Sequence, residues 1–249
     1  MPFCHRGSVR IHYEEAGSGM PLLILPGGGL NATIANAGEK GPFNAMAAFS
    51  GEYRCITLDS RNAKDGQSRG PLEIERPWDG YADDQLGLMD HLGIREFFYM
   101  GYCIGGCFAG KLLQRAPQRV VAAVFCQTVG ERPEDPGVMI RHSAQNWLPD
   151  FRARRPEVRM ETIEKYQHSL WSVQPDFLYS VPREFIRNCR TPILVLPDDT
   201  SSHPLQTSID VASLAPNAEV TVFPWRDPPE LKARTINRVR TFLKSHLPK

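Results

Sequence analysis

Short apolar runs alternate with amphipathic segments along most of the chain. The amphipathic segments carry apolar residues three or four positions apart, as at Leu86, Met89 and Leu92, and this spacing predicts helices. The apolar runs are typical of strands in a parallel sheet, buried on both faces. These runs are "PLLILPGGG", "EYRCITLD", "EFFYM", "RVVAAVFCQ", "TPILVLP" and "AEVTVFP". The N-terminal stretch "SVRIHYEEAGSG" alternates instead and indicates an edge strand or hairpin. The alternation of strands and helices predicts a doubly wound, mostly parallel α/β sheet, with ligands at the carboxyl ends of its strands.

The pattern changes between residues 130 and 188. This segment lacks strand-like runs and contains Trp147 and Trp171 among prolines and many charges. It is predicted to be an inserted helical cap between two parts of the core, residues 1–129 and 189–249. A cap of this kind would close over a bound substrate and exclude water.

Composition narrows the possible classes of function. A hydrophobic content of 41% is ample for a core in 249 residues, so disulfides are not needed for stability. With 29 basic and 28 acidic residues, the net charge of +1 argues against nucleic acid or an anionic membrane as a partner. The sequence shows no signal peptide and no apolar run long enough to span a membrane. The expected location is cytoplasmic, with the six cysteines as free thiols.

One cysteine lies in a motif that suggests chemistry. The stretch "GYCIGG" places Cys103 between a predicted strand and a predicted helix, with Gly101 and Gly105 two residues away on each side. In a G-x-nucleophile-x-G turn the strained backbone exposes the central side chain, and the helix N-terminus favours its anion. The alternative is a buried structural cysteine in a glycine-rich turn. We favour the nucleophile.

With this motif in place, the chain resembles the α/β-hydrolase superfamily from end to end. The stretch "IHYEEAGSGMPLLILPGGG" is similar to its opening hairpin, third strand and oxyanion loop, and "ITLDSRNAKDGQS" to its D-x-R-G-x-G-x-S segment. The cysteine turn is similar to that of dienelactone hydrolases, whereas the remainder looks more like the capped ester and carbon–carbon bond hydrolases. Pro26 stands where many relatives have histidine.

The resemblance implies an oxyanion hole built from backbone N–H groups. One donor would be Ile104, just after the nucleophile, and the others Gly28 and Gly29 in the glycine loop. Glycines let the chain approach a substrate carbonyl and direct N–H donors at the oxygen that becomes negative.

The catalytic base is the difficult assignment. In the superfamily an acid follows the strand after the cap, and a histidine precedes the last helix. Asp198 and Asp199 follow the strand, but "VFPWRDPPELK" has Trp225 and its neighbours where the histidine belongs. His203, in "LPDDTSSHP", lies in the acid loop and is the predicted replacement, oriented by Asp199 or Asp198, with Asp199 preferred. His142 and His168 of the predicted cap are candidates to roof the pocket.

Three functions remain open on this reasoning. We favour a hydrolase of a small, partly apolar ester, lactone or thioester, in which Cys103 attacks and His203 moves the proton. The alternatives are a cofactor-independent carbon–carbon hydrolase or lyase, and a non-catalytic binder of small molecules. No metal or organic cofactor is implied, and the oligomeric state is open, a homodimer included. The residues predicted to contact substrate are Tyr102, Trp147, Trp171 and Trp225.

Overall fold

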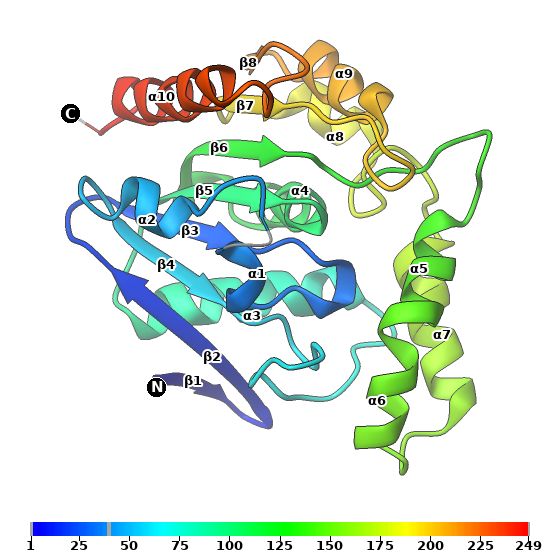
Figure 1. The fold of residues 1–249 in the computed structure, drawn as a ribbon. Coiled ribbons are helices and arrows are strands. Elements are labelled where there is room, and N and C mark those ends of the chain that lie inside the picture. Colours follow the sequence, from blue (N-terminus) through cyan, green and yellow to red (C-terminus); the bar gives the residue numbers. More distant parts are fainter. Residues whose placement is uncertain (1, 39–40, 249) are drawn as a thin grey trace.

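A single eight-stranded sheet organises the molecule in the computed structural model, which describes residues 2–38 and 41–248 (Figure 1). The strands lie in the order β1-β2-β4-β3-β5-β6-β7-β8. The first three in this order, β1, β2 and β4, pair antiparallel, and all other pairs are parallel. Their bounds are β1 (Phe3–Arg6), β2 (Val9–Ala16), β3 (Pro21–Leu25), β4 (Arg54–Leu58), β5 (Phe97–Tyr102), β6 (Val120–Cys126), β7 (Ile193–Leu196) and β8 (Ala218–Val220). The predicted α/β fold is confirmed.

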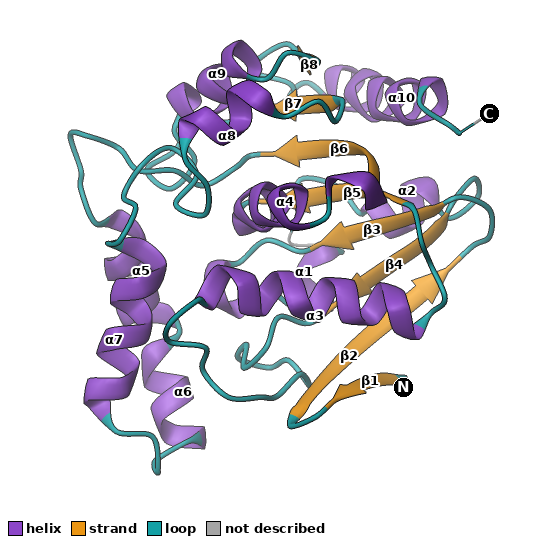
Figure 2. Ribbon diagram, turned by 180° about the vertical axis from the view of Figure 1, so that it is seen from behind, coloured by secondary structure: helices purple, strands orange, loops and turns teal. Residues whose placement is uncertain are grey.

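Helices cover both faces of the sheet (Figures 1 and 2). On one face pack α3 (Pro77–His91), α4 (Ile104–Arg115), α8 (Arg183–Asn188) and α9 (Leu205–Leu214). On the other pack α2 (Ala45–Phe49) and α10 (Pro229–Ser245). Each face therefore has its own apolar core, and the wholly buried central strands contribute to both, as their apolar runs predicted.

Several boundaries differ from those predicted. The helix α3 begins at Pro77, four residues before the predicted start, because proline is well suited to the first position of a helix. The last strand, β8, ends at Val220 rather than continuing to Pro224, where proline lacks the N–H of a ladder hydrogen bond. The apolar pattern did not predict several short helices, which are too short to show a helical period: η1 (Gly29–Asn31), α1 (Ile34–Ala37), α2 and η2 (Pro117–Arg119).

The segment predicted as a cap is helical in the structure. Three of its helices, α5 (Val138–Asn146), α6 (Leu148–Arg154) and α7 (Met160–Trp171), lie beyond the carboxyl ends of the parallel strands (Figure 1). The fourth, α8, packs with α9 instead. The three outer helices are joined to the core by polar contacts, among them a 2.6 Å hydrogen bond between the hydroxyls of Tyr81 in α3 and Tyr166 in α7.

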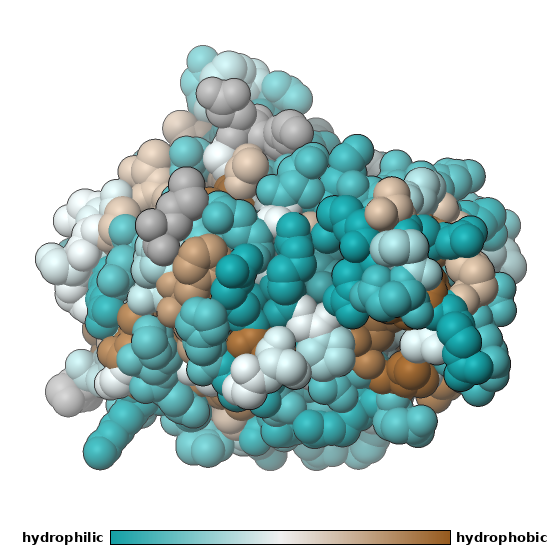
Figure 3. Space-filling model, turned by 90° about the horizontal axis from the view of Figure 1, so that it is seen from below, coloured by the Kyte–Doolittle hydropathy of each residue, from teal (hydrophilic) through white to brown (hydrophobic). Residues whose placement is uncertain are grey.

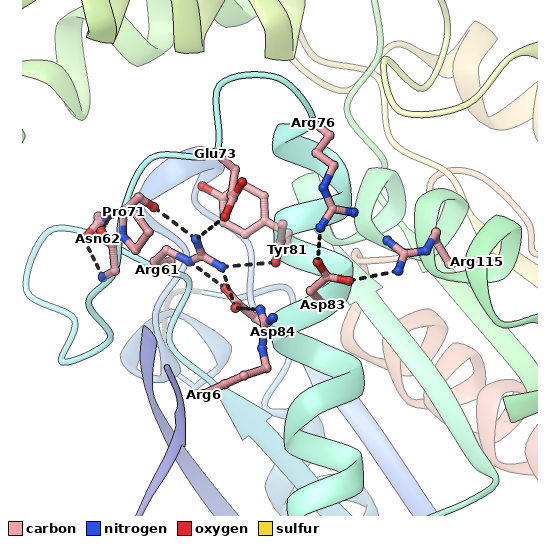
Figure 4. Close-up of polar contacts among 12 residues, drawn as sticks. Arg6, Arg61, Asn62, Pro71, Glu73, Arg76, Tyr81, Asp83, Asp84 and Arg115 are labelled. Atoms are coloured by element: carbon pink, nitrogen blue, oxygen red, sulfur yellow. Dashed lines mark hydrogen bonds and ion pairs between the residues drawn. The ribbon is translucent and has the colours of Figure 1, made fainter. Parts of the chain in front are cut away.

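The loop after β4 is fixed by two buried charged groups. Asp59 accepts hydrogen bonds from His12 Nδ1 at 2.9 Å and from the backbone N–H of Ile34 at 2.9 Å. Arg61 pairs with Asp84 of α3 through two contacts of 2.9 and 2.6 Å (Figure 4). Asp59 and Arg61 of the D-x-R segment thus stabilise the fold.

The surface is largely polar on the face shown in Figure 3, where apolar residues form only separate small spots. In the described part of the chain, the helices lack the combination of length and apolar character that crossing a bilayer requires.

Candidate active site

Cys103 lies at the sharp turn between β5 and α4. Its backbone has φ 56° and ψ −116°, a conformation that a residue with a side chain rarely adopts. The flanking glycines are required by space: a Cβ on Gly101 would lie 2.4 Å from the carbonyl carbon and oxygen of Gly105. The strand can therefore approach the helix closely enough to hold the thiol at the helix N-terminus.

The glycine loop after β3 faces the thiol. Gly28 and Gly29 have φ values of 121° and 58°, which favour glycine, and a Cβ on Gly27 would lie 3.1 Å from the Cβ of Cys103. Gly28 and Gly29 line the same cavity as Cys103, and their backbone N–H groups help to lower the pKa of that thiol. Ile104 is the first residue of α4, so its N–H has no acceptor within the helix. The three predicted donors thus belong to the two segments that adjoin Cys103.

His203 lies in the loop after β7 and reaches the same thiol. Its Nδ1 lies 3.0 Å from Thr200 Oγ1 and 3.3 Å from Asp198 Oδ2. Its Nε2 is buried and makes no close hydrogen bond with the described residues. The ring lines the same cavity as Cys103, and its charge acts on that thiol.

The acid beside His203 is Asp198, so the preference for Asp199 is corrected. Asp198 is buried, and its Oδ2 also accepts a 2.7 Å hydrogen bond from Gln127 Nε2. Asp199 points away from the thiol and pairs with Arg132 at 2.9 Å, with about half of its side chain exposed. Consecutive residues of this extended loop direct their side chains to opposite sides, which places one carboxylate in the site and the other outside.

Electrostatics favours an ion pair between the thiol and the imidazole. Burial raises the pKa of Cys103, but the charge and hydrogen bond of His203 and the N–H groups of Gly28 and Gly29 lower it to about 7. Burial lowers the pKa of His203, but the Cys103 thiolate and the carboxylate of Asp198 raise it to about 10. Each group thus favours the charged form of the other.

The other five thiols behave differently. Burial raises the pKa of each of them, to about 12 for Cys55, and leaves them as small apolar core residues. All five are buried, whereas Cys103 is partly exposed. Cys103 therefore differs from the other five in both its exposure and the direction of its pKa shift.

A cavity of about 490 Å³ opens above Cys103, within the usual range for small-molecule sites. Its floor is the glycine loop and the cysteine turn, and Met139 and His142 of α5 line it from the side of the outer helices. His168 is exposed elsewhere. Apart from Met139, Pro42 and the buried Tyr102, the lining consists of glycines and polar side chains.

Three of the four predicted substrate contacts lie outside this lining. Trp147 stacks on Phe151 with ring centroids 4.4 Å apart, and Trp171 packs against Trp78 at 5.4 Å. Trp225 is buried, and its indole N–H donates to the Pro197 carbonyl at 2.7 Å. These three large aromatic rings pack between elements of the core and do not line the cavity.

Tyr102 does line the cavity, although its hydroxyl donates to the Phe43 carbonyl at 3.3 Å and is not available to a ligand. Sequence reasoning missed Gln127 and Arg226, which both contact Asp198. The available signal was their position after β6 and β8, at the strand ends where this class of sheet binds ligands.

Comparison with known proteins gives the same architecture. A family model described as alpha/beta hydrolase fold matches residues 20–173. A 2-hydroxymuconate semialdehyde hydrolase from Pseudomonas putida is 28% identical over 244 residues, covering 86% of this chain and 82% of that protein. The match to RutD of Azorhizobium caulinodans is 29% identical over 121 residues, 48% of this chain, and spans only 42% of that relative's length.

Solved structures are similar over nearly the whole chain. The meta-cleavage product hydrolase CumD from Pseudomonas fluorescens IP01 superposes with a TM-score of 0.71 at 19% identity and covers 98% of both chains. The enol-lactonase from Burkholderia xenovorans LB400 gives 0.67 at 20% identity, covering 98% of this chain and all of that one. Identities this low support the shared fold alone.

Proposed function

The chain belongs to the alpha/beta hydrolase fold family and is an enzyme of the hydrolase type, and from this premise we propose that it hydrolyses a small ester, lactone or thioester through Cys103. The observation that supports this most directly is the chain of contacts from the thiol to His203 and on to Asp198 beside a cavity of about 490 Å³. His203 is the proposed base and Asp198 the residue that orients it.

In the acylation step the thiolate attacks the carbonyl carbon and forms a carbon–sulfur bond. The negative charge that develops on the carbonyl oxygen is stabilised by the N–H groups of Gly28, Gly29 and Ile104. Each such donor typically contributes about 3 kcal/mol of barrier lowering. When the intermediate collapses, the bond to the leaving oxygen or sulfur breaks, and the His203 imidazolium gives that atom its proton. The products are the free alcohol or thiol and a thioester on Cys103.

In the deacylation step the same residues act in reverse. His203, now neutral, takes a proton from a water molecule while the water oxygen attacks the thioester carbonyl. The carbon–sulfur bond breaks, the acid is released, and the thiolate–imidazolium pair is restored. Asp198 keeps Nδ1 protonated throughout, so that Nε2 is the nitrogen that exchanges the proton.

We also propose that helices α5 to α7 serve as the predicted cap. Support comes from Met139 and His142, both on α5, which line the cavity opposite the thiol. The ring of His142 lies close enough to Gly29 that a Cβ there would be 3.3 Å from it. Substrate selection would therefore depend on α5 more than on the two tryptophans.

Intact-mass spectrometry tests the proposed function. Exposure to a panel of activated esters and lactones should add one acyl group to the protein, and peptide mapping should locate it on Cys103. The Cys103→Ala variant should gain none, whereas Cys4→Ser, altered at a buried thiol, should be acylated normally. An adduct on another cysteine, or hydrolysis that persists in Cys103→Ala, would refute the assignment.

Carbon–carbon bond hydrolysis is a second candidate. It is favoured by the match of the Pseudomonas putida 2-hydroxymuconate semialdehyde hydrolase to 86% of this chain. The same cavity and oxyanion donors would serve it. Analysis of the products formed from a vinylogous 1,5-diketone acid, compared with those from a simple ester, separates the two reactions.

A further inference from the structure

Arg226 lies in the active-site cavity with most of its hydrogen-bonding capacity unused. Trp225 turns its ring into the core, and the next side chain, that of Arg226, lines the cavity with 45% of its surface exposed. Its one protein contact among the described residues joins Nη2 to Asp198 Oδ1 at 3.3 Å. A guanidinium has five N–H donors in a planar fork. The remaining donors are available to a ligand.

Neutralising Asp198 does not account for this arginine. Asp198 already contacts His203 and Gln127 through its other oxygen. An arginine that served a buried carboxylate alone would be expected to make two short, parallel contacts to it. The single contact here is long and leaves the fork turned to the cavity.

Arg226 provides the local positive charge that could hold an anion at this position. The thiolate of Cys103 and the imidazolium of His203 together carry no net charge. Burial and the charge of His203 lower the pKa of His142, which keeps that ring neutral at pH 7. Arg226 is then the permanent cation among the described lining residues, and Asp198 the one carboxylate. The nearby carboxylate would repel a doubly charged phosphate more than a singly charged carboxylate.

We infer that Arg226 binds a carboxylate group of the substrate, so that the enzyme acts on esters, lactones or thioesters that carry a free carboxylate. This inference rests on the proposed function for the reaction, but the binding of the anion can be measured separately. A planar fork pairs with a carboxylate through two parallel hydrogen bonds, which fixes the orientation of the substrate as well as its affinity. The carboxylate would thereby hold the scissile carbonyl over Cys103.

Paired substrates of nearly equal shape test the inference. The wild-type enzyme should hydrolyse 3-carboxyphenyl acetate with a kcat/KM at least about tenfold above that for 3-carbamoylphenyl acetate, which lacks the charge. In Arg226→Gln the rate with the carboxylate ester should fall about tenfold more than the rate with the carbamoyl ester. Arg226→Lys should retain part of the preference, since it keeps the charge but loses the fork. Circular dichroism checks that each variant is folded.

Binding gives a readout that does not require turnover. By calorimetry, 3-hydroxybenzoate should bind the wild-type protein more tightly than 3-hydroxybenzamide, and Arg226→Gln should remove the difference. If neither ester is hydrolysed but this binding difference appears, the proposed reaction fails and the carboxylate site stands. Equal handling of the charged and neutral probes by the wild-type protein, or a preference that survives in Arg226→Gln, overturns the inference. If Arg226→Gln does not fold, the inference is tested by the preference of the wild-type protein and of Arg226→Lys for the carboxylate probe over the neutral one.

Discussion

The loops after β7 and β8 leave neighbouring strands at the same end of the sheet, yet they serve different purposes. The loop after β7 carries Asp198 and His203, which form a connected polar group with Cys103. The loop after β8, where the superfamily resemblance places a histidine, contributes the buried Trp225. Its indole N–H donates to the carbonyl of Pro197, directly before Asp198. Trp225 of the second loop thus supports the first loop, while its neighbour Arg226 lines the cavity. One strand end can therefore supply both packing and a polar group.

The largest effect on the rate of hydrolysis is expected from removing the Cys103 thiol. Cys103→Ala should lower the rate of ester hydrolysis on the order of 10⁴-fold or more, because both chemical steps pass through the sulfur. Cys103→Ser should also lose most activity, since a hydroxyl needs a stronger base. Stopped assays with an activated ester measure this loss. Activity close to wild type in Cys103→Ala would contradict the proposal that Cys103 is the nucleophile.

Replacing His203 tests whether the loop after β7 provides the base. His203→Ala should lower the rate about a hundredfold or more. It should also move the pH midpoint of Cys103 alkylation by iodoacetamide upward from about 7, because the imidazolium lowers the pKa of that thiol. In the wild type, hydrolysis should rise with pH through about 7 and fall through about 10 as His203 loses its proton.

The matched control for that experiment is His168→Ala, which alters an exposed histidine of α7. It should leave both the rate and the alkylation profile as they are in the wild type. If His203→Ala behaves like this control, the base is elsewhere.

The two adjacent aspartates provide a sharper version of the comparison within one loop. Asp198→Asn should reduce the rate roughly tenfold to a hundredfold, less than the ~10⁴-fold loss for the acid of a serine triad, because the thiol here is already ionised. Asp199→Asn removes an equal charge one residue away, where it contacts Arg132, and should change the rate less than about twofold. Steady-state kinetics of both variants measures this contrast. A larger loss in Asp199→Asn would reverse the assignment of the acid.

The smallest effect on catalysis is expected at Trp225 of the second loop. Trp225→His should not restore activity to His203→Ala, because the indole is directed at the Pro197 carbonyl rather than at the thiol. The change should nonetheless lower the free energy of unfolding by about 3 kcal/mol, since a large buried ring is replaced by a smaller polar one. Urea denaturation measures the stability. Recovery of turnover in the double variant would show that this position remains competent for a catalytic histidine.

The parts of the site that depend on local backbone geometry could be predicted from the sequence. Gly101 and Gly105 around Cys103, and the glycines after β3, are needed because the chain turns sharply or approaches closely at those points. The fold followed from apolar periodicity for the same reason: burial on one or both faces leaves a pattern along the chain.

The parts that depend on direction or on distant neighbours could not be predicted. Whether Asp198 or Asp199 faces the base depends on how one loop is rotated, and both residues look alike in sequence. Whether Trp147 lines a pocket or stacks on Phe151 depends on packing between α5 and α6, since a large ring satisfies either role. Arg226 lines the cavity while its neighbour Trp225 is buried, and the sequence does not show which of the two faces the core.

The proposed acid and base lie within the six residues from Asp198 to His203. In a site whose histidine comes from the loop before the last helix, the two groups belong to separate segments of the gene and can be lost independently. Here a single short exchange between related genes would transmit both together, and a single short deletion would remove both. Their proximity along the chain would make the proposed pair one unit of inheritance.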